Sequence, residues 1–161
     1  MNFQQAVSAS PWLAGGLQPS LHALRPGHRG LIAIGNTRRL QHSLNLEATL
    51  IATEPRTKQW DYAMGWQSAG GQDSCCFAEV HPANSTSATD LVGKKRDMEA
   101  WLLRNGAALR QLARETAVRT NAPVWHWLAT DAPIAIRKGS QAAKQLAAAG
   151  ISGPKRRLDL D

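Results

Sequence analysis

The sequence contains no run of apolar residues approaching the roughly 18 that a membrane-spanning helix needs. It has only two cysteines, Cys75 and Cys76, which are adjacent. Neighbours on a strand point to opposite faces, so we expect no disulfide between them, and no second pair of Cys or His at ligand spacing accompanies them to bind zinc. The first residues also lack a signal-peptide pattern. These absences predict a non-membrane protein of the reducing cytoplasm.

Acidic residues are missing from the first 40 positions, which carry four arginines. Residues 41–90 hold six acids against two bases, and residues 91–161 hold thirteen bases against six acids, for a net charge of +7. Basic segments attract polyanions, whereas clustered carboxylates need solvent or a cation. A scatter of these charges over the folded surface explains the same pattern equally well.

The chain has 161 residues, of which 43% are apolar and 19% are charged. This composition is too apolar for a disordered chain, and the length suits one domain. We expect a loosely structured N-terminal arm over residues 1–24, a single α/β domain over 25–151 and a charged tail over 152–161. The arm has prolines and glycines but no sustained hydrophobic period beyond one short helix.

The middle of the chain shows the alternation typical of strands. We predict strands over 30–35, 43–55, 58–67 and 74–81, with Glu47 on the second and a hairpin loop at 68–73. In the third, bulky side chains alternate with Asp61, Ala63 and Gly65, so Asp61 faces away from the aromatic side. Helices over 90–104 and 107–118, a strand over 122–130, a short strand over 131–136 and a helix over 139–150 follow. The order predicts an α/β sandwich with a mixed sheet of about four to five strands flanked by helices.

Three polar residues on two of these strands form the candidate chemical site. Glu79 and His81 share one strand face at i, i+2, and pairing of the 58–67 and 74–81 strands brings Asp61 toward Glu79. Repulsion between two close carboxylates is relieved by a proton or a metal ion, which makes a hard-cation site plausible. Any β-hairpin can carry two acids, so the pairing alone leaves a purely structural role open.

The segments W-D-Y around Asp61 and E-V-H-P-A around Glu79 resemble the PD-(D/E)xK phosphodiesterase superfamily. They are also similar to a group of small bacterial proteins. The superfamily core is a helix, three strands, a helix and a strand, with an Asp on the second strand and a (Glu or Asp)-x-Lys on the third. The likeness covers roughly residues 29–157 and implies a restriction-endonuclease-like fold and metal-dependent nuclease activity.

The resemblance implies that Asp61 and Glu79 hold Mg²⁺ or Mn²⁺, with the Val80 carbonyl and Glu47 as further ligands. His81 stands where the superfamily has its lysine, so it would position the attacking water or complete the metal shell. Lys94 or Lys95 in the following helix could supply the missing positive charge. Of these two, we assign Lys95 to catalysis and Lys94 to nucleic-acid binding.

The expected partner is nucleic acid, DNA rather than RNA, and specificity would require a homodimer or another protein. Five basic residues are candidates for contacts with phosphates: Arg38, Arg39, Lys94, Arg137 and Lys138. His22, His28 and His42 are expected on the surface, and Trp125 and Trp127 in the core. Two alternatives remain open, namely a catalytically inactive nucleic-acid-binding module and a protein-interaction module on the same fold.

Overall fold

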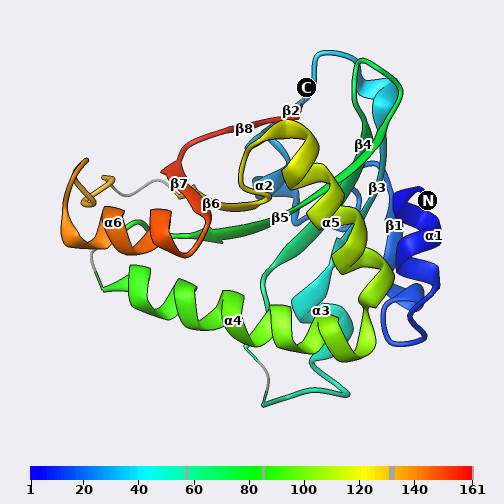
Figure 1. The fold of residues 1–161 in the computed structure, drawn as a ribbon, viewed down its shortest axis with the longest axis horizontal. Coiled ribbons are helices and arrows are strands. Elements are labelled where there is room, and N and C mark those ends of the chain that lie inside the picture. Colours follow the sequence, from blue (N-terminus) through cyan, green and yellow to red (C-terminus); the bar gives the residue numbers. More distant parts are fainter. Residues whose placement is uncertain (57, 85, 131–132, 161) are drawn as a thin grey trace.

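The computed structural model describes residues 1–56, 58–84, 86–130 and 133–160. Its centre is a six-stranded mixed sheet in the order β1-β3-β4-β5-β6-β7 (Figure 1). The strands are β1 (Leu17–Pro19), β3 (Leu40–Asn45), β4 (Tyr62–Gln67), β5 (Asp73–His81), β6 (Trp125–Ala129) and β7 (Ile151–Lys155). Strands β1, β3, β4 and β5 pair antiparallel in this order, whereas β6 and β7 run parallel to β5. The predicted α/β class with a mixed sheet is confirmed, with six strands instead of four to five.

Two long helices cross from β5 to β6, as a parallel connection requires. They are α4 (Ser87–Asn105) and α5 (Ala107–Thr120), which follow each other directly and run in different directions from their junction (Figure 1). The shorter helices are α1 (Phe3–Ser8), α2 (Pro26–Arg29), α3 (Leu46–Leu50) and α6 (Gln141–Ala148), with 3₁₀ turns η1 (Ala14–Gly16) and η2 (Thr37–Arg39). The predicted helices over 90–104, 107–118 and 139–150 are present with slightly different ends.

Strand β4 is buried on both faces, which explains its alternation of large and small residues. The register pairs Gly65 with Cys75 and Ala63 with Phe77. A Cβ added to Gly65 would overlap the Phe3 side chain of α1, so the small side chains admit a helix close to the sheet. On α5, Thr116 Oγ1 accepts a hydrogen bond from the backbone N–H of Cys75 at 3.1 Å. Thus α1, α4 and α5 cover the sheet face that carries Gly65 and Phe77.

The prediction of one strand over 43–55 is wrong beyond Asn45. There β3 ends and α3 begins, because the Asn45 side chain accepts a hydrogen bond from the Ala48 N–H at 2.8 Å and acts as the N-cap. Glu47 therefore lies in the first turn of a helix. The predicted strand over 30–35 is reduced to β2 (Ile32–Ala33), which pairs with β8 (Leu158–Asp159) in a separate small sheet. Residues 131–132 of the predicted 131–136 strand lie outside the described residues, and 133–136 form no strand.

The N-terminal 24 residues are an integral part of the core, and the prediction of a loose arm is wrong. A capping box starts α1, since the Asn2 side chain accepts from the Gln5 N–H and the Gln5 side chain accepts from the Asn2 N–H. Phe3 is completely buried, as is Leu13, and Leu24 is 2% exposed. The helix α1 packs its buried residues Phe3, Ala6 and Val7 against the sheet, where it contacts β3 and β4.

Phe3→Ala is expected to lower the free energy of unfolding by about 3–5 kcal/mol, because it leaves a large cavity under α1 beside Gly65. Urea denaturation followed by tryptophan fluorescence measures this. Gln4→Ala, an exposed substitution in the same helix, serves as the control and should leave the midpoint unchanged. An equally small effect of both substitutions would mean that α1 adds nothing to the core.

The segment predicted as a charged tail over 152–161 contains strand residues within its described part, 152–160. Strand β7 joins the main sheet and β8 pairs with β2, while Leu158 and Leu160 are 3% and 2% exposed. These leucines alternate with charged residues. Because the leucines are buried, they anchor the segment to the domain while the charged side chains remain outside. The basic residues of this segment are therefore fixed to the surface of the domain.

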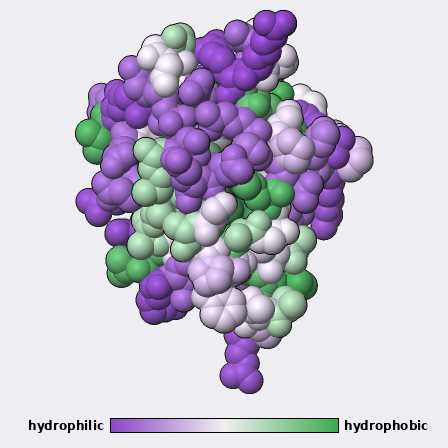
Figure 2. All heavy atoms as spheres, turned by 90° about the vertical axis from the view of Figure 1, so that its right-hand side faces the viewer, coloured by the Kyte–Doolittle hydropathy of each residue, from purple (hydrophilic) through white to green (hydrophobic). Residues whose placement is uncertain are grey.

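The outer edges of the main sheet are β1 and β7, and each contains a proline, Pro19 and Pro154. Figure 2 views the molecule from the side of α1 and shows a mostly hydrophilic surface with a smaller apolar area in its lower half. Trp12, in the loop after α1, is 46% exposed. Among the described residues, no helix has the length and apolarity to cross a membrane.

Candidate functional site

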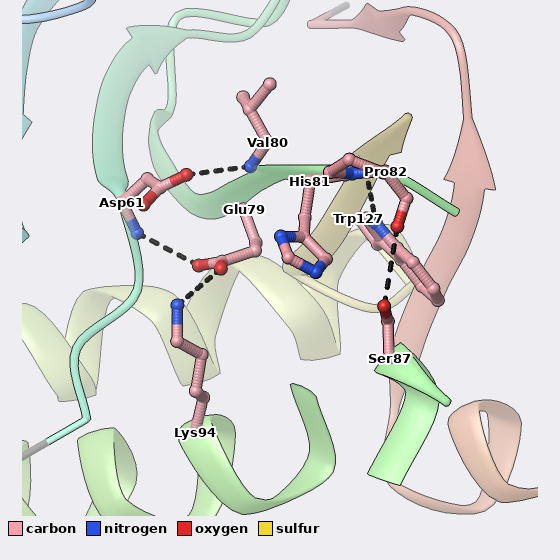
Figure 3. Close-up of polar contacts among 8 residues, drawn as sticks. All are labelled: Asp61, Glu79, Val80, His81, Pro82, Ser87, Lys94 and Trp127. Carbon is pink, nitrogen blue, oxygen red and sulfur yellow. Dashed lines mark hydrogen bonds and ion pairs between the residues drawn. The ribbon is translucent and has the colours of Figure 1, made fainter. Parts of the chain in front are cut away.

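Asp61 and Glu79 lie opposite each other where β4 begins and β5 nears its end. Continuing the β4–β5 register by one pair from Tyr62 and Ala78 places Asp61 across from Glu79. The Asp61 N–H donates to Glu79 Oε2 at 3.2 Å, and the Val80 N–H donates to Asp61 Oδ2 at 2.9 Å (Figure 3). The prediction that this strand pair brings the two acids together is confirmed.

Lys94 reaches the carboxylate pair from the second turn of α4. Its Nζ donates to Glu79 Oε1 at 2.5 Å (Figure 3). The Glu79 side chain is only 3% exposed, and that of Lys94 is 29% exposed. A buried carboxylate that is paired with a half-buried ammonium is strongly coupled to it, because little water screens the two charges.

Burial sets the protonation of the carboxylates. Desolvation and the neighbouring Asp61 charge raise the pKa of Glu79 to about 7, against the opposing effect of Lys94. Desolvation also raises the pKa of Asp61, while the Val80 N–H and the charges of Lys94 and His28 act to lower it. Both carboxyl groups therefore favour the protonated form more than they would in water, and the charge of Lys94 offsets only part of this effect.

The carboxylates open into a cavity of about 260 Å³ with an almost entirely polar lining. Besides the residues above, Arg25, His28, Asn45 and Tyr62 line it. His28 Nδ1 and the Tyr62 hydroxyl are 2.8 Å apart, and the Arg25 N–H donates weakly to the same hydroxyl at 3.4 Å. Tyr62 is 2% exposed, so its hydroxyl is a fixed part of the wall.

The expectation that His28 is an ordinary surface residue is therefore wrong. The sequence offered no local signal, because His28 and Tyr62 are separated by 34 positions and meet only in the folded chain. Arg25 was missed for the same reason. The α2 segment that carries both residues contains no hydrophobic period that would orient it.

His81 lines the same cavity and shares the strand face of Glu79 (Figure 3). Its backbone carbonyl accepts a hydrogen bond from Trp127 Nε1 at 3.0 Å, which fixes the end of β5 to β6. Val80 also lines the cavity, and its N–H is engaged by Asp61. His81 is exposed, so its imidazole can meet a molecule that enters from solvent.

Lys95, which was predicted to act in catalysis, does not line the cavity that holds Asp61 and Glu79. Its Nζ donates to Glu99 at 2.7 Å and sits 5.4 Å from the centre of the Trp125 ring. The structure brings Lys94 to the carboxylates instead. Glu47 lines the cavity from α3, but within the described part of the chain no three His, Cys, Asp or Glu side chains are grouped closely enough to hold a metal ion. The predicted third carboxylate ligand is thus not in place.

The other basic candidates lie at the periphery. Arg38 and Arg39 belong to η2 before β3, and Arg137 and Lys138 are exposed in the segment before α6. Lys94 is the single member of the five predicted phosphate contacts that lines the cavity.

The aromatic and cysteine residues serve the core. Trp125 and Trp127 are 6% and 0% exposed, which confirms their predicted packing role. Cys75 and Cys76 form no disulfide, and burial raises the pKa of Cys76 to about 12 and that of Cys75 well above its usual value. Both thiols therefore stay protonated and unreactive.

Comparison with known proteins adds no assignment: no family model, no curated protein and no solved structure matches this chain.

Proposed function

We propose that this protein hydrolyses phosphodiester bonds of nucleic acid, DNA rather than RNA, with a divalent cation held by Asp61 and Glu79. The observation that carries the proposal is the convergence of the buried Glu79 carboxylate, the partly buried Asp61 carboxylate and one lysine in a polar cavity. The element order supports the resemblance to restriction-endonuclease-like enzymes. Three antiparallel strands, β3 to β5, are followed by a long helix and by β6, which is parallel to β5.

The residues at the site fit Mg²⁺ or Mn²⁺. Carboxylate oxygens are the ligands these hard cations prefer, and both carboxylates line the same polar cavity. Asp61 and Glu79 would hold the ion, with the Val80 carbonyl as a further ligand. When bound, such an ion polarises the phosphate and makes a bound water more acidic.

The protein's own groups supply the remaining functions. Lys94, which is already directed at the site, stabilises the negative charge that develops on the phosphate oxygens. His81, beside Glu79, positions the attacking water. Arg25, at the exposed rim of the cavity, binds the phosphate backbone.

Purified protein is expected to cleave DNA when Mn²⁺ is added, to cleave it more slowly with Mg²⁺, and to lose activity in a chelator. Imidazole next to the carboxylates favours Mn²⁺ over Mg²⁺. Plasmid, single-stranded DNA and single-stranded RNA, each incubated with either ion and resolved on gels, provide the measurement. If all three substrates stay intact with both ions, the protein is not a nuclease.

Lack of cleavage would favour the second candidate, a nucleic-acid-binding module without catalysis. The hydrogen bonds from Lys94 and from the Asp61 N–H to Glu79 support that reading, because they satisfy the Glu79 carboxylate within the chain. Binding to labelled DNA at increasing salt separates it from a protein-interaction module, since phosphate contacts weaken steeply with salt.

A further inference from the structure

Two basic side chains approach the carboxylate pair from opposite faces of the sheet. Successive residues of a strand point to opposite faces, so Tyr62 projects away from the face that carries Ala63, Phe77 and Glu79. His28 contacts the hydroxyl of Tyr62, whereas Lys94 contacts Glu79. Both nevertheless line the same cavity at the strand ends.

The segment that carries His28 is held in place by several contacts. The His28 N–H donates to the Arg25 carbonyl at 2.9 Å, and Arg29 Nε donates to the Leu24 carbonyl at 3.1 Å. Leu24 is 2% exposed and anchors the segment in the core. The His28 and Tyr62 rings meet edge to face, with centroids 5.7 Å apart at 78°. The imidazole is therefore oriented by its surroundings.

The hydrogen bond to Tyr62 determines which ring nitrogen is available for chemistry. Nδ1 is occupied by the hydroxyl, which leaves Nε2 to exchange a proton with a molecule in the cavity. A histidine with one nitrogen fixed by a neighbour and the other directed to substrate is a common form of general acid.

We propose that His28 is a further catalytic residue, which protonates the leaving oxygen of the phosphodiester, and that Tyr62 is its positioning residue. The inference rests on the proposed function, and it names the substrate class as esters whose leaving group is an unactivated sugar oxygen. Attacking and leaving oxygens lie in line on opposite sides of the phosphorus. Lys94 and His81 occupy one side of the site, so a proton donor from the other face is suitably placed for the leaving group.

The step balances as a hydrolysis. The water oxygen bonds to phosphorus and its proton passes to bulk solvent, while the bond from phosphorus to the sugar oxygen breaks. The proton on Nε2 of the His28 imidazolium joins that oxygen. Solvent then returns a proton to Nε2, so His28 ends as it began.

The test compares two oligonucleotides that differ at one linkage, where sulfur replaces the leaving oxygen. The products formed by the wild type identify whether the 3′ or the 5′ oxygen leaves. A thiolate leaves without protonation, so His28→Gln is expected to slow cleavage of the normal linkage about 100-fold and to leave cleavage of the sulfur linkage near the wild-type rate. Tyr62→Phe should show the same selectivity with a smaller loss. His22→Gln, an exposed histidine outside the cavity, is the matched control.

Two further readouts make each outcome decisive. Calorimetric Mn²⁺ binding should be the same in His28→Gln and in the wild type, since His28 is assigned no metal contact. Equal losses on both linkages, or no loss on either, would overturn the role of His28 and leave the nuclease assignment standing. A wild-type protein that cleaves neither oligonucleotide with Mn²⁺ would overturn both. Far-UV circular dichroism of each variant excludes loss of fold as the cause.

Discussion

Glu79→Gln is expected to reduce metal-dependent DNA cleavage about a thousandfold or more, because a metal ion contributes several kcal/mol to such a reaction and the amide has lost the charge that would hold it. The substitution preserves the size of the side chain and can still accept from the Asp61 N–H. Calorimetry with Mn²⁺ should show the corresponding loss of binding.

The same substitution is expected to stabilise the metal-free protein at pH 8 by a few degrees in Tm. Folding raises the pKa of Glu79 from its usual 4.5 to about 7, so the folded protein favours the protonated form. The stabilisation that protonated Glu79 gives the folded wild-type protein is fully present below pH 4.5 and is lost as the pH rises through about 7. Wild-type protein at pH 8 therefore carries a buried negative charge that glutamine lacks.

Melting curves in chelator at pH 4 and pH 8 measure this difference, which should vanish at the lower pH. Glu99→Gln is the matched control, because Glu99 also pairs with a lysine of α4 but is 44% exposed at the side chain. Retained cleavage in Glu79→Gln would remove the basis for the nuclease proposal. A lower Tm at pH 8 would mean that the Lys94 pair outweighs the burial of the charge.

Lys94→Gln is expected to lower the cleavage rate about 100-fold, as loss of one charged donor to the reacting phosphate does. Glutamine removes the charge and retains a hydrogen-bond donor. The effect should appear in kcat, since the charge on the phosphate develops in the transition state. Single-turnover cleavage with saturating Mn²⁺ provides the measurement.

Lys95→Gln is the control for this experiment, because Lys95 is the next residue of the same helix and contacts Glu99 and Trp125 instead of the carboxylates. It should cleave at close to the wild-type rate. Equal losses in the two variants would point to a general effect on α4 and would leave Lys94 without a specific role.

The sequence was sufficient to predict the central hairpin and the crossover helices. The large–small alternation around Met64 and the proline after His81 are local signals, and the register of β4 with β5 follows from them. The pairing of Asp61 with Glu79 could be predicted for the same reason. Helical periodicity could not separate Lys94 from Lys95, since both flank the apolar stripe through Leu91 and Met98. Only the position of β5 along α4 determines which lysine reaches Glu79.

The errors have different physical causes. At Asn45 a helix cap ended the strand, although apolar and polar residues continue to alternate through Glu47. At the N-terminus, the reciprocal caps of Asn2 and Gln5 were a readable signal that the prolines and glycines of the following residues obscured. No local pattern could reveal the contact of His28 with Tyr62, because it depends on how the whole segment folds back over the sheet.

The two edge prolines have a consequence for self-association. An exposed strand edge offers unpaired N–H and C=O groups on which a second molecule can extend the sheet. Here one edge is a strand of three residues that ends at Pro19, and the other is interrupted by Pro154, neither of which has an N–H to donate. Strand-to-strand pairing between copies is thus disfavoured at both ends, which protects the fold against sheet-mediated aggregation.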